Sequence, residues 1–422
     1  MFKRIIFLLF SATLSLFLLA SCSAKEKNPS LKEKDGLIFE PLNEDKSEYV
    51  LVKKTESKKE IIIPSEIDGK PVTAISYSVF EDDNTLEKIT IPDSVNEIGN
   101  YAFNNCKELR EVVFSSRIEK IGFKAFSGCE KIEEIFLPES LTHIESGAFS
   151  NCIALSKLHL NPLIETIGRD CFVGCDSISE IHVSDVAAFS GITFENIEAN
   201  PIVNAEKLFV SGTHTENLTI TGAETIREYA FFGFKGIKTL TLGEGVVNVN
   251  ESAFSGCSSL KSLTLSDSVK TLGTSAFNNC SALEYVSVGG AEYFAGLAFY
   301  NCESIKTLEI RDLFAWCNAF FYTDSTGSAN PMLYADTLTV NGEAVDTLRI
   351  PDGVEKISTL SFIGFKGSGV FLPSTLKVIE DTAFYKCDSL VNLHFDGSLG
   401  ELNRLSIGYN NFEMVTKISY KG

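Results

Sequence analysis

Hydrophobic and polar positions repeat along most of this chain with a period of about 23 residues. The mark of each repeat is a phenylalanine, usually preceded by alanine and followed three residues later by cysteine. It recurs every 22 or 23 residues within three blocks: Phe80, Phe103, Phe126, Phe149 and Phe172; Phe231, Phe254, Phe277 and Phe299; Phe362 and Phe384. Self-similarity at a fixed period of about 20 to 50 residues predicts a solenoid.

One repeat, residues 129–152, shows what each unit forms. The order apolar-x-x-apolar-x-apolar at Ile132, Ile135 and Leu137 predicts a short strand with one buried face. Pro138 ends that strand, and the following apolar residues turn back into the interior, namely Leu141, Ile144, Ala148 and Phe149. A single unit buries too little apolar surface to offset the entropy of ordering its backbone, so each unit needs its neighbours.

The first 21 residues predict an export signal. Lys3 and Arg4 precede an apolar run over residues 5–19, which is shorter than a membrane span. Residues 19–22, Leu-Ala-Ser-Cys, resemble a bacterial lipobox, which implies cleavage before Cys22 and lipidation of its thiol. The alternative is an ordinary signal peptide that contains a cysteine.

The rest of the chain divides by composition. Residues 22–35 are charged and predict a flexible tether, and Ser23 after the lipidated cysteine implies the outer membrane by resemblance to Gram-negative lipoproteins. Alternating apolar residues predict a capping hairpin over 36–60. We expect the solenoid to span 61–397, with long rungs at about 185–230 and 312–361, and a second cap to span 398–422.

Eight cysteines occupy one phase of the repeat: Cys106, Cys129, Cys152, Cys175, Cys257, Cys280, Cys302 and Cys387. A ladder of disulfides or metal ligands is one interpretation. The other is a small buried side chain that fits a tight turn. We favour the second, because ligands stacked along one line do not converge on a metal, and parallel Cβ directions suit a disulfide poorly.

The repeated phrase LxxIxLPxSLxxIxxxAFxxC resembles the bacterial leucine-rich repeats of the Treponema and BspA type. The likeness is carried by Leu155-Leu158-Leu160 and by Ile144-Ala148-Phe149-Cys152, and it covers nearly all of residues 36–422. It implies a β-rich leucine-rich-repeat solenoid, a curved right-handed stack of about 23-residue rungs with a parallel sheet on one face and few short helices.

The two long rungs match each other. Asp185 and Asp312 each begin a predicted short helix as its N-cap. An Asn-Pro pair follows in both, at 200–201 and 330–331, and hairpin turns are expected near 211–212 and 341–342.

Charge and motifs narrow the function. The chain has 422 residues and a formal net charge of -19, which argues against nucleic acid as a partner and against adsorption to anionic lipid. It lacks the GxSxG, GxxxxGK[ST] and HExxH motifs, and a repeat lattice places side chains in rows rather than in a converging pocket. We therefore expect no enzyme, no cofactor and no metal site.

One outward-facing column stands out. It lies between the second and third apolar positions of the strand and holds Val113, Phe136, His159 and His182 in consecutive repeats, where other repeats have Thr or Ser. We expect these four side chains to stack about 4.8 Å apart and to form a candidate partner-binding patch. Ordinary surface variation is the alternative.

The hypothesis from sequence is a non-enzymatic bacterial surface lipoprotein, anchored through Cys22 to the outer membrane or cell surface. Its leucine-rich-repeat solenoid would bind protein or glycan partners, and the family resemblance implies adhesion to host or neighbouring cells. Two alternatives stay open. One is a periplasmic or envelope scaffold protein, and the other is a lipoprotein that captures glycans or nutrients beside an outer-membrane transporter.

Overall fold

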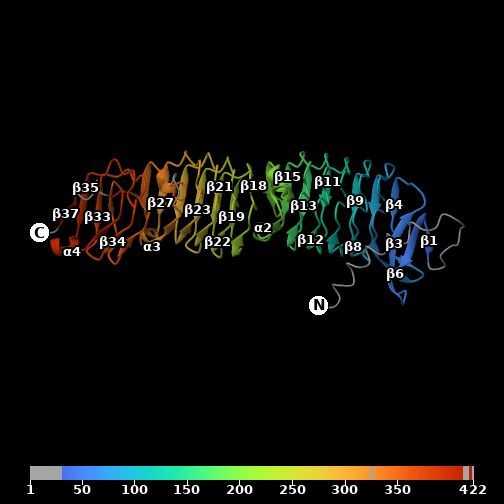
Figure 1. Ribbon diagram of the computed structural model, residues 1–422. Coiled ribbons are helices and arrows are strands. Elements are labelled where there is room, and N and C mark those ends of the chain that lie inside the picture. The colour runs from blue at the N-terminus through green and yellow to red at the C-terminus, as the bar shows by residue number, and fades with distance from the viewer. Residues whose placement is uncertain (1–30, 324–326, 412–417, 421–422) are drawn as a thin grey trace.

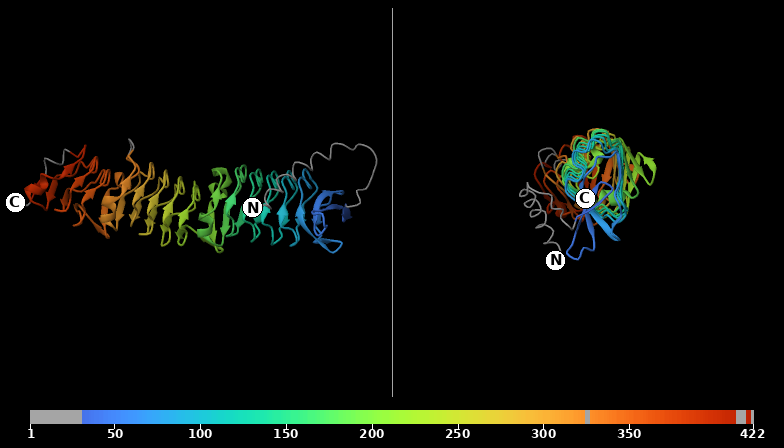
Figure 2. Two further views of the ribbon diagram at one scale, coloured as in Figure 1. Left: turned by 60° about the horizontal axis from the view of Figure 1, so that its bottom comes forward. Right: turned by 90° about the vertical axis from the view of Figure 1, so that its right-hand side faces the viewer.

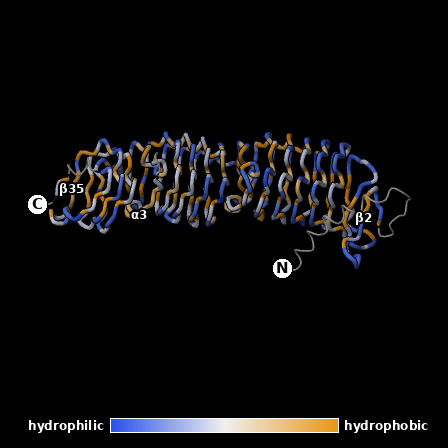
Figure 3. Tube along the Cα trace, in the orientation of Figure 1, coloured by the Kyte–Doolittle hydropathy of each residue, from blue (hydrophilic) through white to orange (hydrophobic). Residues whose placement is uncertain are grey.

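The computed structural model describes residues 31–323, 327–411 and 418–420, which form one elongated solenoid (Figure 1). Its turns follow one another along a single axis, with the N-terminal cap at one end and the C-terminal cap at the other. Viewed along that axis, the turns superpose into one closed outline (Figure 2). Hydrophobic and hydrophilic stretches alternate within the turns along the whole body (Figure 3). The predicted β-rich leucine-rich-repeat solenoid is confirmed.

Over the described residues, mostly parallel strands run along one side of the solenoid as four successive sheets, and we call this side the wide row. Its strands are β4 (Glu60–Ile62), β7 (Lys88–Thr90) and β9 (Glu111–Val113); β11 (Glu134–Phe136), β13 (Lys157–Leu160), β15 (Glu180–Val183), β17 (Lys207–Val210) and β18 (Thr213–Thr215); β19 (Asn217–Ile220), β21 (Thr239–Leu242), β23 (Ser262–Leu265), β25 (Tyr285–Val288), β27 (Thr307–Ile310), β29 (Thr337–Val340) and β30 (Glu343–Ala344); β31 (Thr347–Arg349), β33 (Gly369–Leu372), β35 (Asn392–Phe395) and β37 (Ile418–Tyr420).

A second ladder of strands, mostly two residues long, runs beside the first, and we call it the narrow row. Its strands are β6 (Lys70–Ile75), β8 (Glu97–Ile98), β10 (Lys120–Ile121), β12 (His143–Ile144), β14 (Thr166–Ile167) and β16 (Thr193–Phe194); β20 (Thr225–Ile226), β22 (Asn248–Val249), β24 (Thr271–Leu272), β26 (Tyr293–Phe294) and β28 (Phe320–Phe321); β32 (Lys356–Ile357), β34 (Val378–Ile379) and β36 (Ser406–Ile407). The sequence did not reveal this row, because two residues are too few to show an alternating pattern.

The two long rungs interrupt both rows. The first contains α2 (Val186–Ser190), η1 (Ile197–Ala199), η2 (Pro201–Val203) and the hairpin β17–β18; the second contains α3 (Leu313–Asn318), η3 (Pro331–Leu333) and the hairpin β29–β30. Asp185 and Asp312 cap the two helices through their side chains. New sheets begin at β19 and β20 after the first long rung, and at β31 and β32 after the second.

The N-terminal cap begins earlier than the sequence predicted. Strand β1 (Lys32–Lys34) pairs antiparallel with β2 (Leu37–Pro41), which pairs with β3 (Tyr49–Lys54). Three residues of the predicted tether, 22–35, are therefore part of the folded cap. Strand β5 (Glu66–Ile67) pairs with β6 beside the cap. Residues 1–21 and Cys22 lie outside the described residues. At the other end, the predicted cap contains α4 (Leu399–Leu402), β36 and β37.

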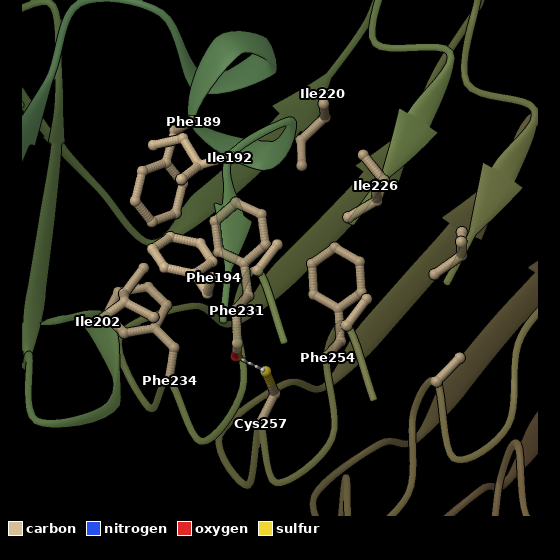
Figure 4. Close-up of a cluster of buried hydrophobic side chains, with 14 of the residues drawn as sticks. Phe189, Ile192, Phe194, Ile202, Ile220, Ile226, Phe231, Phe234, Phe254 and Cys257 are labelled. Atoms are coloured by element: carbon tan, nitrogen blue, oxygen red, sulfur yellow. Dashed lines mark hydrogen bonds between the residues drawn. The ribbon is translucent and has the colours of Figure 1, made fainter. Parts of the chain in front are cut away.

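The repeated phenylalanines form a buried stack through the interior. Neighbouring rings within a block lie nearly parallel, with centroids 4.9 to 5.7 Å apart from Phe80 to Phe172. Figure 4 shows how the interior continues across the first long rung: Phe189 of α2 packs edge-on against Phe231, 5.4 Å away, and Phe231 stacks on Phe254. The core is thus shared between turns rather than contained in any one of them.

The repeated cysteines belong to the same interior. Each thiol donates a hydrogen bond to the backbone carbonyl of the anchor phenylalanine one turn earlier; Cys129 to Phe103 and Cys257 to Phe231, both at 3.2 Å, are two instances. The same carbonyl also accepts the backbone N–H of the residue three positions later, for example Cys106 for Phe103 and Phe234 for Phe231, so the thiol is its second donor and links two turns. All eight are free thiols, and burial raises the pKa of Cys106 and Cys387 to about 12.

Replacing Phe149 by alanine tests this shared core. The ring is fully buried between Phe126, 5.4 Å away, and Phe172, 5.7 Å away. We expect Phe149→Ala to lower the free energy of unfolding by about 3–5 kcal/mol. Hydrogen exchange should show the loss of protection concentrated in neighbouring turns and fading with distance. The exposed Phe136→Ala is the control and should leave protection unchanged, and equal loss at Phe149 and at Phe384 would contradict a core that is coupled turn by turn.

Candidate functional site

The outward column of the wide row forms a continuous stack of rings in the first part of the solenoid. Strands β11, β13, β15 and β17 pair in parallel, with Phe136 opposite His159, His159 opposite His182, and His182 opposite Phe209. The ring centroids lie 4.0, 4.2 and 4.4 Å apart, and neighbouring ring planes differ by 6 to 21°. We call these four residues the aromatic ladder.

The local sequence explains why the rings stand outward. Each strand alternates, and its inward residue is buried: Ile135, Leu158, Ile181 and Leu208. Because parallel strands in register place equivalent residues directly beside one another, a ring in each turn becomes a stack. The ladder therefore follows from the burial of the residues behind it.

The predicted column and the aromatic ladder differ at two residues, Phe209 and Val113. Phe209 was missed, because the long rung places it 27 residues after His182 instead of 23. Val113 was expected to stack with the others, but among the described strands β9 does not pair with β11. Val113 is 39% exposed and lies on the turn before the ladder. At this break Phe114 packs edge-on against Phe126, with the centroids 5.6 Å apart.

The two ends of the ladder differ. At one end Phe209 meets His214 on β18, with centroids 5.4 Å apart, so the hairpin closes the stack. At the other end Phe136 is 60% exposed, whereas the side chains of His159 and His182 are only 27% and 21% exposed. One face of the Phe136 ring lies on His159, so its exposure comes from the face and edges turned away from that histidine.

Carboxylates flank the ladder. Oε1 of Glu134 lies 2.9 Å from Nε2 of His159. Glu180 pairs with Lys207 at 3.3 Å and with Lys157 at 3.8 Å. Surface ion pairs of this kind stabilise the fold little, so their main effect is on the local potential.

The environment of His182 keeps its imidazole neutral. Burial lowers its pKa, and the neighbouring His159 lowers it further, against the opposing effect of Glu180. Nε2 of His182 makes no hydrogen bond within the described structure and lies 3.5 Å from Oε2 of Glu180. His182 therefore favours its uncharged form within the stack.

The matched Asn-Pro segments of the long rungs have a structural role. The amide of Asn200 accepts a hydrogen bond from the backbone of Ile202 and donates to the carbonyls of Tyr229 and Ala230. Asn330 makes the equivalent contacts, to Met332, Leu360 and Ser361. Both amides are buried, so these residues hold successive turns together rather than face a partner.

Other kinds of site find less support. Over the described ranges, no three His, Cys, Asp or Glu side chains are placed to hold a metal ion. The helices within those ranges are all too short or too polar to cross a membrane. A hollow of about 470 Å³ opens at the first long rung, lined in part by Leu163, Thr193 and Arg227.

Comparison with known proteins gives a sequence family and several similar structures. Six copies of the repeat described as a BspA type leucine rich repeat region match residues 73–200, 205–326 and 341–420. A leucine rich cell surface protein from Faecalibacterium prausnitzii is 22% identical with a TM-score of 0.37, over 90% of this chain and 99% of that one. The pneumococcal vaccine antigen PcpA is 17% identical with a TM-score of 0.39, over 93% and 98%. A leucine-rich repeat protein from Bacteroides ovatus is 20% identical with a TM-score of 0.35, over 93% and 100%. No curated protein matches this sequence.

The lowered pKa of His182 predicts a pH-dependent stability. The unfolded chain takes up a proton near the ordinary pKa of about 6.5, before the folded chain does, so this residue destabilises the fold as pH falls from 7.5 to 5.5. His182→Phe keeps the stack and removes that proton site. We expect its urea midpoint to fall less than that of the unaltered protein over this range.

The comparison isolates His182, because the charged groups around it are the same in both proteins: Glu134, Lys157, His159, Glu180 and Lys207. Equal decreases in the two proteins would show that burial of His182 does not affect its protonation.

Proposed function

The chain belongs to the BspA-type leucine-rich-repeat family, and from this premise we propose that it is a non-enzymatic bacterial surface lipoprotein. Its solenoid binds a protein or glycan partner through the wide row, and this binding serves adhesion. The lipid on Cys22 anchors the folded body to the outer membrane or cell surface, and the neighbouring charged residues separate the two.

The observation that carries the binding proposal is the open end of the aromatic ladder. Phe136 exposes 60% of its surface on a regular, rigid sheet, beside rings that are mostly covered. Well-packed aromatic anchors contribute most of the binding energy in protein interfaces. The stacked imidazole rings of His159 and His182 extend this aromatic surface away from Phe136.

The anchor is tested by Cys22→Ser. Lipidation needs the thiol, so this change should leave uncut precursor and abolish incorporation of labelled fatty acid. Protease treatment of intact cells then shows whether the solenoid is outside, since a periplasmic scaffold would be protected. Labelling that survives Cys22→Ser would contradict the lipid anchor.

The binding surface is tested by Phe136→Ser in cells that display the protein. We expect the substitution to leave the fold intact and to weaken capture of host matrix proteins or glycans at least about 30-fold. The matched control is Phe320→Ser, which removes a ring that is 51% exposed on the narrow row. If both variants bind like the unaltered protein, the aromatic ladder is not the binding surface.

A further inference from the structure

After the second long rung, the outward column contains another phenylalanine, Phe371, whose ring is covered by a neighbouring cation. Arg349, Phe371 and His394 lie directly opposite one another on β31, β33 and β35, in the same outward column. The guanidinium carbon of Arg349 lies 4.2 Å from the centre of the Phe371 ring. Nη1 of Arg349 also lies 3.2 Å from Oδ2 of Asp396. A phenylalanine of this column is thus covered by a planar cation on one side and flanked by a histidine on the other.

The aromatic ladder begins with the same sequence of a phenylalanine followed by a histidine, but the residue one turn before Phe136 is a valine instead of an arginine. Val113, Phe136 and His159 occupy consecutive turns in the places of Arg349, Phe371 and His394, although in the described structure β9 and β11 do not pair as β31 and β33 do. Phe371 is half-buried, whereas Phe136 is 60% exposed. Within the described ranges, the cation–π contacts join Lys124 to Phe123, Arg349 to Phe371 and Lys386 to Tyr385, and none involves Phe136.

The charges around Phe136 suit a cation. Glu111 and Glu134 precede Val113 and Phe136 by two residues, so they face outward on the same side of their strands. Their side chains are 56% and 42% exposed, although Glu111 already pairs with Lys88 and Glu134 with His159. A carboxylate has two oxygens and about four acceptor positions, so each can accept a second donor. The chain as a whole carries a formal charge of -19.

We propose that the face of Phe136 turned away from His159 binds an arginine side chain of a cationic protein partner. This rests on the proposed function, in which the wide row is the binding surface, and it names the group that the surface recognises. The guanidinium stacks on the ring as Arg349 stacks on Phe371, and its N–H groups donate to Glu111 and Glu134. Arginine fits better than lysine, because its planar group stacks on a ring and donates in two directions at once.

The experiment measures binding of two labelled peptides to the full-length protein at low salt. The peptides are acetyl-GRGRG-amide and acetyl-GKGKG-amide, which carry equal charge. We expect the arginine peptide to bind at least about fivefold more tightly, and we expect Phe136→Ser to abolish that preference. Phe320→Ser, the matched exposed ring, should leave the preference unchanged.

Val113→Arg provides the sharper test, because it supplies the missing cation from within the chain. The new arginine should cover Phe136 and weaken binding of the arginine peptide at least about tenfold. The control is Val391→Arg, which adds the same charge at a valine that is 56% exposed and lies away from the ladder. Equal affinity for the two peptides, or equal weakening by the two arginine variants, would overturn the proposal and leave only attraction by net charge.

The outcomes also separate this inference from the proposed function. A partner whose capture needs Phe136, together with no preference for the arginine peptide, would refute arginine recognition and keep the binding function. A glycan that stacks on Phe136 would have this result. A preference for the arginine peptide without any captured partner would support arginine recognition by Phe136 and contradict the proposed adhesion function.

Discussion

The fold depends on the burial of one phenylalanine per turn between the phenylalanines of the adjacent turns. Phe149 has Phe126 on one side and Phe172 on the other, at 5.4 and 5.7 Å, and its own turn supplies neither contact. The thiol of Cys152 strengthens the same dependence by donating to the carbonyl of Phe126. Apart from the hairpins in and beside the N-terminal cap and in the long rungs, the strand hydrogen bonds of the described residues also run between turns. The core and the backbone pairing of a turn are therefore completed by its neighbours, so stability arises from stacking.

Much of this arrangement was predictable, because the features that repeat in the sequence are those that the stack requires. The period, the strand and the outward direction of Phe136 follow from the spacing of the buried residues. What could not be predicted depends on how one turn meets the next. Phe209 joins the ladder only because the long rung brings a strand back into register after an irregular spacing. The pairing gap next to Val113 lies between two turns of ordinary length. The acceptor of each cysteine thiol depends on the orientation of a carbonyl in a turn, which the sequence pattern does not encode.

Parallel pairing in register brings aromatic side chains at equivalent positions of successive turns into one continuous stack on the surface. A single exposed Phe or His on a sheet needs no explanation, but in this column of four the ring centroids of adjacent turns are held 4.0 to 4.4 Å apart. Stacking covers the ring faces of His159 and His182 and disfavours the charged form of the second. The ladder is therefore a rigid strip of stacked rings on an acidic protein. The spacing of the paired strands, as well as the identity of the residues, determines which parts of the rings are exposed.

The ends of that strip follow from the interruptions in the solenoid. The hairpin of the first long rung places His214 against Phe209 and closes one end. The pairing gap after β9 leaves the other end at Phe136 open. In the third part of the solenoid the turn before Phe371 carries Arg349, and that ring is covered from within the chain. The solenoid thus contains a covered and an uncovered phenylalanine in the same outward column. They differ in the side chain one turn earlier, Arg349 or Val113, and in strand pairing, since β31 pairs with β33 but β9, within the described residues, does not pair with β11. Arg349 covers Phe371 from within the chain, whereas Val113 is too short to cover Phe136 in the same way. The uncovered face of Phe136 is therefore the place where we propose that a guanidinium of another protein stacks.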